Sequence, residues 1–191
     1  MPDRSPVVEL LEALSAVLGG LGARWYLFGA QAVTVWGRPR MSADVDVTAA
    51  IDAARVPDLL LSMAEQGFEL RVRTDVDAFV ARTRVLPFVH TPTRLPLDLV
   101  LAGPGLEEEF LDRAQSVDLG GLLVPILSPE DLVVTKVLAG RTKDLEDVAG
   151  ILRERRSRLD VSRIRSTLRL LEEALGQSDL VRAFEALLDR G

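Results

Sequence analysis

Two aspartates separated by a single residue, Asp44 and Asp46, are the side chains of this sequence that are best placed to do chemistry. They lie in an Asp-Val-Asp-Val-Thr stretch that is typical of a β-strand, in which successive side chains point to opposite faces. Both carboxylates therefore face the same way, about 6–7 Å apart from the rise per residue. Because carboxylate oxygens are the ligands that hard divalent cations prefer, this strand could hold one or two such ions.

The elements in front of this strand point to a phosphate. Trp25–Phe28 is apolar and predicts a strand, Gly29-Ala30 predicts a turn, and Gln31–Trp36 predicts a short helix. Backbone N–H groups at the N-terminus of a helix bind phosphate readily. A phosphate site next to a metal site indicates phosphoryl or nucleotidyl transfer.

This stretch resembles the signature of the DNA polymerase beta nucleotidyltransferase superfamily, which is a strand, a small-residue turn, a helix and Asp-x-Asp. It is more similar still to the AbiEii-like nucleotidyltransferases, the toxins of type IV toxin–antitoxin systems. In that family thirteen residues separate Gly-Gly or Gly-Ser from Asp-x-Asp, and Arg-x-Ser/Thr-x runs into the first aspartate. Here Gly29-Ala30 stands at the same spacing from Asp44, and Arg40–Ala43 matches the segment before it. Ala30 departs from the pattern, because alanine keeps its N–H group but adds a methyl and supplies no hydroxyl.

A third carboxylate, Asp98, lies in the alternating apolar stretch Leu95–Leu101. An ionised carboxylate among apolar side chains is costly unless something pairs with it. The resemblance implies that Asp98 is the third carboxylate of the superfamily; the alternative is an aspartate at a strand end that faces water. The other Asp-x-Asp, Asp75–Asp77, has no glycine turn and helix before it and predicts a turn between strands.

The resemblance implies a catalytic and metal-binding set of Asp44, Asp46 and Asp98 that holds two Mg²⁺ ions, with Asp98 taking the proton of the acceptor hydroxyl. For the nucleoside triphosphate it implies a binding set of Gly29, Ala30, Arg40, Ser42, Lys136 and Asp144. Lys136 lies in an apolar helical segment, where the alternative is a lysine with a buried stem and a hydrated head. Asp144 lies in Arg141–Asp147, which resembles a later Arg/Lys-Asp motif of the family but also fits an ordinary helix N-terminus.

The resemblance also implies an acceptor and a partner. The acceptor would be RNA, in particular the tRNA 3′ end, and a cognate antitoxin protein would restrain the toxic activity. Seven arginines in Arg153–Arg169 could hold an RNA backbone, or could form a solvated helical face. Three alternatives stay open: transfer to a small hydroxylated antibiotic, transfer to a partner protein, and a catalytically silent nucleotidyltransferase fold that serves as a binding module.

Composition removes several other classes of function. The chain has no cysteine and one histidine, His90, which excludes thiol nucleophiles and argues against a Ser-His-Asp triad. It contains no apolar run long enough to span a membrane, and its N-terminal segment does not have the pattern of a secretory signal. We therefore expect a cytoplasmic protein with no membrane partner.

The pattern along the chain predicts an α/β (α+β) architecture of the nucleotidyltransferase kind, with a mixed β-sheet flanked by helices. Residues 1–125 are the expected core, and residues 126–191 the expected C-terminal helical lobe packed on it. Helices are predicted at residues 6–18, 31–36 and 52–66, and from 129 onwards with few breaks. After the strand that carries the paired aspartates, further strands are predicted at residues 68–71, 78–84, 88–91 and 95–101, with a hairpin at 116–125.

Overall fold

The computed structural model describes residues 5–39, 42, 44–72 and 75–190. The chain divides into two compact units. The sheet unit comprises Met1–Gln31 and Ser42–Leu127, and the helical unit comprises Ala32–Met41 and Ser128–Gly191. The division between domains that the sequence predicts after residue 125 stays a prediction.

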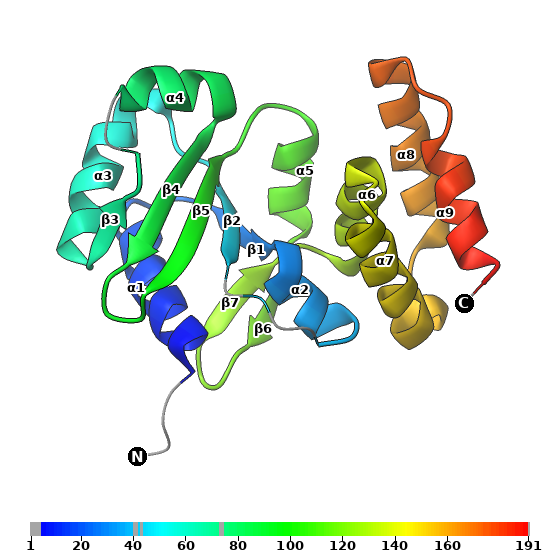
Figure 1. The fold of residues 1–191 in the computed structure, drawn as a ribbon, viewed down its shortest axis with the longest axis horizontal. Coiled ribbons are helices and arrows are strands. Elements are labelled where there is room, and N and C mark those ends of the chain that lie inside the picture. The colour runs from blue at the N-terminus through cyan, green and yellow to red at the C-terminus, as the bar shows by residue number, and fades with distance from the viewer. Residues whose placement is uncertain (1–4, 40–41, 43, 73–74, 191) are drawn as a thin grey trace. The chain divides into compact units, whose positions relative to one another are not determined.

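The sheet unit is built on one seven-stranded sheet with the order β3-β4-β5-β2-β1-β7-β6 (Figure 1). Its strands β2 and β5 run parallel, as do β1 and β7, and the other neighbouring strands are antiparallel, so the predicted mixed sheet is confirmed. The strands are β1 (Trp25–Phe28), β2 (Val45–Ala49), β3 (Phe68–Leu70), β4 (Val85–His90), β5 (Leu95–Leu101), β6 (Gln115–Asp118) and β7 (Leu123–Ile126).

Helices flank this sheet (Figure 1). They are α1 (Pro6–Gly20), η1 (Ala53–Arg55), α3 (Val56–Glu65), α4 (Val76–Thr83) and α5 (Leu106–Arg113), together with the start of α2 (Gly29–Trp36). Helix α1 packs against α3 and β5 and buries leucines at the i, i+3 and i+4 spacing that the sequence predicts. On β2 and β5, the side chains of Val45, Val47, Leu97 and Leu99 are fully buried, which fixes the face on which their polar neighbours lie.

The prediction of a strand at residues 78–84 is wrong, because this segment belongs to helix α4 and its C-cap, Arg84. Asp75 begins the helix as its N-cap, and its side chain accepts a hydrogen bond from the backbone N–H of Ala78. Arg84 ends it in the left-handed region at φ 57°. The apolar residues Val76, Phe79 and Val80 are three and four positions apart, a helical spacing that outweighs the β-propensity of valine and phenylalanine. The second Asp-x-Asp therefore starts a helix and does not join two strands.

The helical unit contains the rest of α2, with α6 (Pro129–Ala139), α7 (Thr142–Arg155), η2 (Arg156–Arg158), α8 (Val161–Leu175) and α9 (Leu180–Leu188) (Figure 1). Helix α6 begins as the sequence predicts: Ser128 Oγ accepts from the backbone N–H of Asp131, and Pro129 follows the cap. Apolar side chains of α6–α9, among them Val133, Ile151 and Phe184, form its core. None of the helices that the structure describes is both long and apolar enough to cross a membrane.

Candidate active site

The parallel pairing of β2 with β5 brings two of the predicted carboxylates together. Asp46 stands directly opposite Asp98 in the register of these strands, and both side chains are half-buried. Residues that are opposite each other on neighbouring strands project from the same face of the sheet, so the two carboxylates are neighbours on the face away from the buried valines and leucines. This pair is the candidate site of the sheet unit.

The third predicted carboxylate, Asp44, directly precedes β2 and is exposed. Within the described ranges, the structure contains no group of three or more histidine, aspartate or glutamate side chains that could hold a metal ion. The structure thus assembles a pair of carboxylates, with Asp44 at the entry to the same strand, and not a closed three-carboxylate cluster.

Gly29 lies against the carboxylate of Asp46. Its φ of 65° falls in the left-handed region, and a Cβ atom at this position would stand 2.0 Å from Asp46 Oδ2. Any side chain here would therefore have to displace the aspartate. Two physical reasons favour glycine at position 29: its backbone conformation and the close approach of the Asp46 carboxylate. The first turn of α2, which begins at Gly29, therefore lies beside Asp46.

The loop in front of β2 is tied to the same helix. The side chain of Gln31 on α2 donates a hydrogen bond from Nε2 to the backbone carbonyl of Ser42, over 3.3 Å. Ser42 is half-buried. Arg40, the other residue that the sequence assigns to the triphosphate from this loop, lies outside the described residues.

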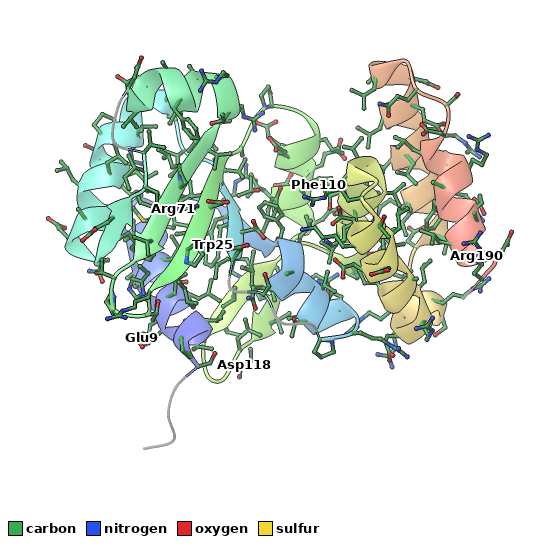
Figure 2. All side chains as sticks on the ribbon, in the orientation of Figure 1. Glu9, Trp25, Arg71, Phe110, Asp118 and Arg190 are labelled. Atoms are coloured by element: carbon green, nitrogen blue, oxygen red, sulfur yellow. The ribbon has the colours of Figure 1, made fainter. Side chains whose placement is uncertain are left out.

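Asp98 already has a cationic partner, which the sequence did not reveal. Arg71, which follows β3 and is labelled in Figure 2, makes an ion pair from its Nη2 to Asp98 Oδ1. The two side chains are 43% and 42% exposed, so water reaches both. No local pattern marks Arg71, because its partner is 27 residues away and only the strand order brings the two together.

Lys136 and Asp144 belong to the helical unit, where they take part in a buried ionic network. Lys136 Nζ on α6 lies 3.0 Å from Asp144 Oδ1 and 2.8 Å from Asp147 Oδ2, both on α7. Arg141 also contacts the Asp144 carboxylate. The lysine side chain is only 8% exposed, so it does not have the hydrated head of the alternative considered above. In the described structure the ammonium joins α6 to α7.

The pKa of Asp144 reflects this network. Burial acts to raise it and is the largest single effect, but hydrogen bonds and charges from Arg141 and Lys136 together outweigh burial and hold the pKa below its usual value. The carboxylate is therefore ionised at neutral pH although its side chain is almost completely buried.

Three arginines of the basic run have partners within the helical unit. Arg155 stacks on the ring of Trp36 and donates to the last carbonyls of α2, Arg163 Nη2 lies 2.8 Å from Glu130, and Arg165 binds Glu185. The hydrogen bond from Arg165 lowers the pKa of Glu185. The other four arginines are exposed: Arg153, Arg156, Arg158 and Arg169. Only part of the run is thus available to a ligand.

A cavity of about 320 Å³ also lies within the helical unit. Its lining includes the cations Arg38 and Arg153 and the carboxylates of Glu146 and Asp147. Asp147 also binds Lys136, so the part of the cavity wall that Asp147 forms belongs to the buried ionic network. The mixed charges give the cavity no net preference for an anion.

Comparison with known proteins identifies a family to which this chain is similar. Residues 9–168 match the model of a family described as a nucleotidyltransferase of unknown function (DUF6036). No curated protein sequence matches the chain.

Solved structures share the fold at low sequence identity. The antibiotic-resistance factor ANT(2'')-Ia superposes with a TM-score of 0.60 at 14% identity, over 88% of this chain and 92% of that chain. The lincosamide antibiotic adenylyltransferase LnuA, bound to lincomycin, gives 0.53 at 13% identity over 78% of this chain and 98% of that one. An antigenic nucleotidyltransferase-like protein from Paracoccidioides brasiliensis gives 0.57 at 18% identity, over 97% and 95%. The predicted nucleotidyltransferase fold is confirmed by this likeness.

Proposed function

Because the chain belongs to the nucleotidyltransferase family whose model matches residues 9–168, we propose that it transfers a nucleoside monophosphate from a nucleoside triphosphate to an acceptor hydroxyl. The observation that carries this proposal is the pairing of Asp46 with Asp98 on neighbouring parallel strands, beside the glycine turn that starts α2. Such a site has both of the parts that the reaction needs, a place for cations and a helix N-terminus for phosphate.

The donor set fits magnesium. Mg²⁺ demands hard oxygen ligands, keeps several waters, and is commonly bound by one or two carboxylates together with substrate phosphates. Asp46 and Asp98 offer two half-exposed carboxylates in register. Two like charges about 4 Å apart cost about 4 kcal/mol at an effective dielectric constant of 20, a penalty that a divalent cation removes. We propose that Asp44, Asp46 and Asp98 hold two Mg²⁺ ions.

Bound Mg²⁺ would neutralise charge on the phosphates and make the acceptor hydroxyl more acidic. The chain itself supplies the remaining parts of the reaction. Asp98 takes the proton of the acceptor hydroxyl at a carboxylate oxygen, and the N–H groups of Gly29 and Ala30 orient the triphosphate. The acceptor oxygen then bonds to the α-phosphorus as the bond to pyrophosphate breaks. Proposed further contacts to the triphosphate come from Arg40, Ser42 and Lys136, with Asp144 holding the lysine.

RNA, in particular the tRNA 3′ end, is the first candidate acceptor, in a toxin that a cognate antitoxin protein restrains. Its support is the resemblance of Gly29–Asp46 to the AbiEii-like toxins and the presence of four exposed arginines in the helical unit. Nucleoside triphosphates and tRNA occur in the cytoplasm, where we expect the protein to act.

A small hydroxylated molecule such as an antibiotic is the second candidate acceptor. It is supported by the likeness of the fold to ANT(2'')-Ia and LnuA, over 88% and 78% of this chain. It is also supported by the intrachain partners of Arg155, Arg163 and Arg165, which reduce the basic surface that an RNA backbone could use.

One labelling experiment tests the activity and separates the acceptors. The protein is incubated with Mg²⁺ and each α-³²P-labelled nucleoside triphosphate, in parallel with total RNA, with a panel of aminoglycosides and lincosamides, and with cell lysate. Asp46→Asn protein is the matched control. We expect label on RNA or on a small molecule with the unmodified protein only. Label on a lysate protein would indicate that the acceptor is a protein. Absence of label on every acceptor would favour a catalytically silent binding module.

A further inference from the structure

Pro87 determines where β3 ends and where Arg71 lies. The last paired residue of β3 is Leu70, opposite Phe88, and the backbone N–H of the next residue, Arg71, donates to the carbonyl of Pro87 over 2.8 Å. In an antiparallel pair the partner would return a second bond, but proline has no N–H group. The ladder therefore stops at this position, and Arg71 is the last residue held at the edge of the sheet.

Arg71 lies in one row with the two candidate catalytic carboxylates. Pro87 on β4 is opposite Asp98 on β5, and Asp98 is opposite Asp46 on β2. Neighbouring strands are 4.7–4.9 Å apart, so the guanidinium must reach across about 10 Å, over the short proline ring, to contact Asp98. A larger side chain at position 87 would stand in its path. The row explains why the ion pair forms with Asp98 and not with a nearer strand.

Arg71 offsets one of the two negative charges that Asp46 and Asp98 place in this row. Asp46 and Asp98 are like charges on adjacent strands, and a guanidinium stays protonated at any physiological pH. Arg71 thus supplies a permanent positive charge at the place where the proposed function requires a divalent cation. A cation that binds Asp98 must either displace the guanidinium or share the carboxylate with it.

We propose that Arg71 is the resident counter-ion of Asp98 and competes with divalent metal for this carboxylate. It is a positioning residue: it holds the carboxylate while the site has no metal, and it sets the metal concentration at which the site fills. This inference rests on the proposed function, since it assumes that the paired aspartates bind a divalent cation.

The test measures metal affinity and not turnover. Mn²⁺ is titrated calorimetrically, without nucleotide, into the unmodified protein and the variants Arg71→Met, Arg71→Lys and Arg82→Met. An exposed ion pair contributes up to about a factor of five to an equilibrium, and loss of the repulsion between guanidinium and metal adds to this. We expect Arg71→Met to bind Mn²⁺ about three- to tenfold more tightly. Arg71→Lys keeps the charge and should remain closer to the unmodified protein.

Arg82→Met is the matched control, because it removes the same charge from an exposed position on the neighbouring helix α4 and should leave the affinity unchanged. Circular dichroism melting establishes that each variant is folded, and Arg71→Gln is the substitute if Arg71→Met is not. Equal or weaker Mn²⁺ binding by the neutral Arg71 variant, in a protein that binds metal and transfers label, would overturn this inference alone. Absence of Mn²⁺ binding to the unmodified protein, with and without nucleotide, would overturn both the metal assignment of the proposed function and this inference.

Discussion

Substitution of Lys136 by methionine separates a structural role of this lysine from a role at the nucleotide. Methionine keeps the length and the apolar stem of the side chain but removes the ammonium that lies between Asp144 and Asp147. Both carboxylates are at most 6% exposed, so each would lose a cationic partner in a place that water hardly reaches. We expect the variant to be much less stable than the unmodified protein.

The size of the effect follows from this burial. Removal of one partner of a buried ion pair costs about 3–5 kcal/mol, because the charge that remains is not compensated. Asp144 keeps its contact with Arg141, whose side chain is 64% exposed, so the lower end of that range applies. In a chain of this size, about 3 kcal/mol corresponds to a fall of about 6–12 °C in the melting temperature.

Circular dichroism melting of the unmodified protein and of Lys136→Met measures the structural role. Calorimetric titration of nucleotide into both proteins, well below the melting range, measures the role at the nucleotide. The triple variant Lys136→Met/Asp144→Asn/Asp147→Asn removes every charge of the lysine-centred pairs and should regain most of the lost stability, since replacement of a whole buried ion pair is often neutral. An unchanged melting temperature with a large loss of nucleotide affinity would refute the structural role of Lys136 and leave only its proposed contact with the phosphates.

Three further predictions concern single features of the structure. Gly29→Ala should displace the Asp46 carboxylate and lower turnover by at least tenfold in a label-transfer assay, whereas full activity would show that the close approach is tolerated. The double reversal Arg156→Glu/Arg158→Glu should reduce the slope of log affinity for single-stranded RNA against log salt by about 1.4, if both contact phosphate, and an unchanged slope would assign them to solvent. Because the pKa of Asp144 is lowered in the folded state, this carboxylate stabilises the protein at pH values above the ordinary aspartate pKa, and the stabilisation is lost as the pH falls through the lower pKa of the folded state. On acid titration, the melting temperature of Asp144→Asn should therefore fall less than that of the unmodified protein.

Local pattern was sufficient for the parts of the site that lie on single strands. The alternation of Leu95–Leu101 predicts that Asp98 projects away from the core, and the Asp-x-Asp spacing predicts the same for Asp46, because side-chain direction in a strand follows from position alone. Burial of Leu97 and Leu99 agrees with this prediction. The pairing of the two strands could only be inferred from the family resemblance, since register depends on contacts between distant segments.

The features that the sequence did not predict all depend on long-range contacts or on capping. Nothing near Arg71 indicates that the strand order would carry it to Asp98, and nothing near Lys136 indicates that α7 would present two carboxylates to it. The misassigned segment at Val76–Thr83 has residues with high β-propensity, and only its helical spacing and the cap at Asp75 favour a helix.

The most direct test of the central claim is the turnover of Asp98→Asn. Asparagine is nearly isosteric with aspartate, so the variant should fold and melt within a few degrees of the unmodified protein. Asp112→Asn is the matched control, because it also removes an exposed Arg–Asp ion pair, with Arg24, from the sheet unit. If Asp98 takes the proton of the acceptor, label transfer at saturating Mg²⁺ and nucleotide should fall by about 10²–10⁴ in Asp98→Asn and stay unchanged in Asp112→Asn. Turnover by Asp98→Asn within a few-fold of the unmodified protein would contradict the account.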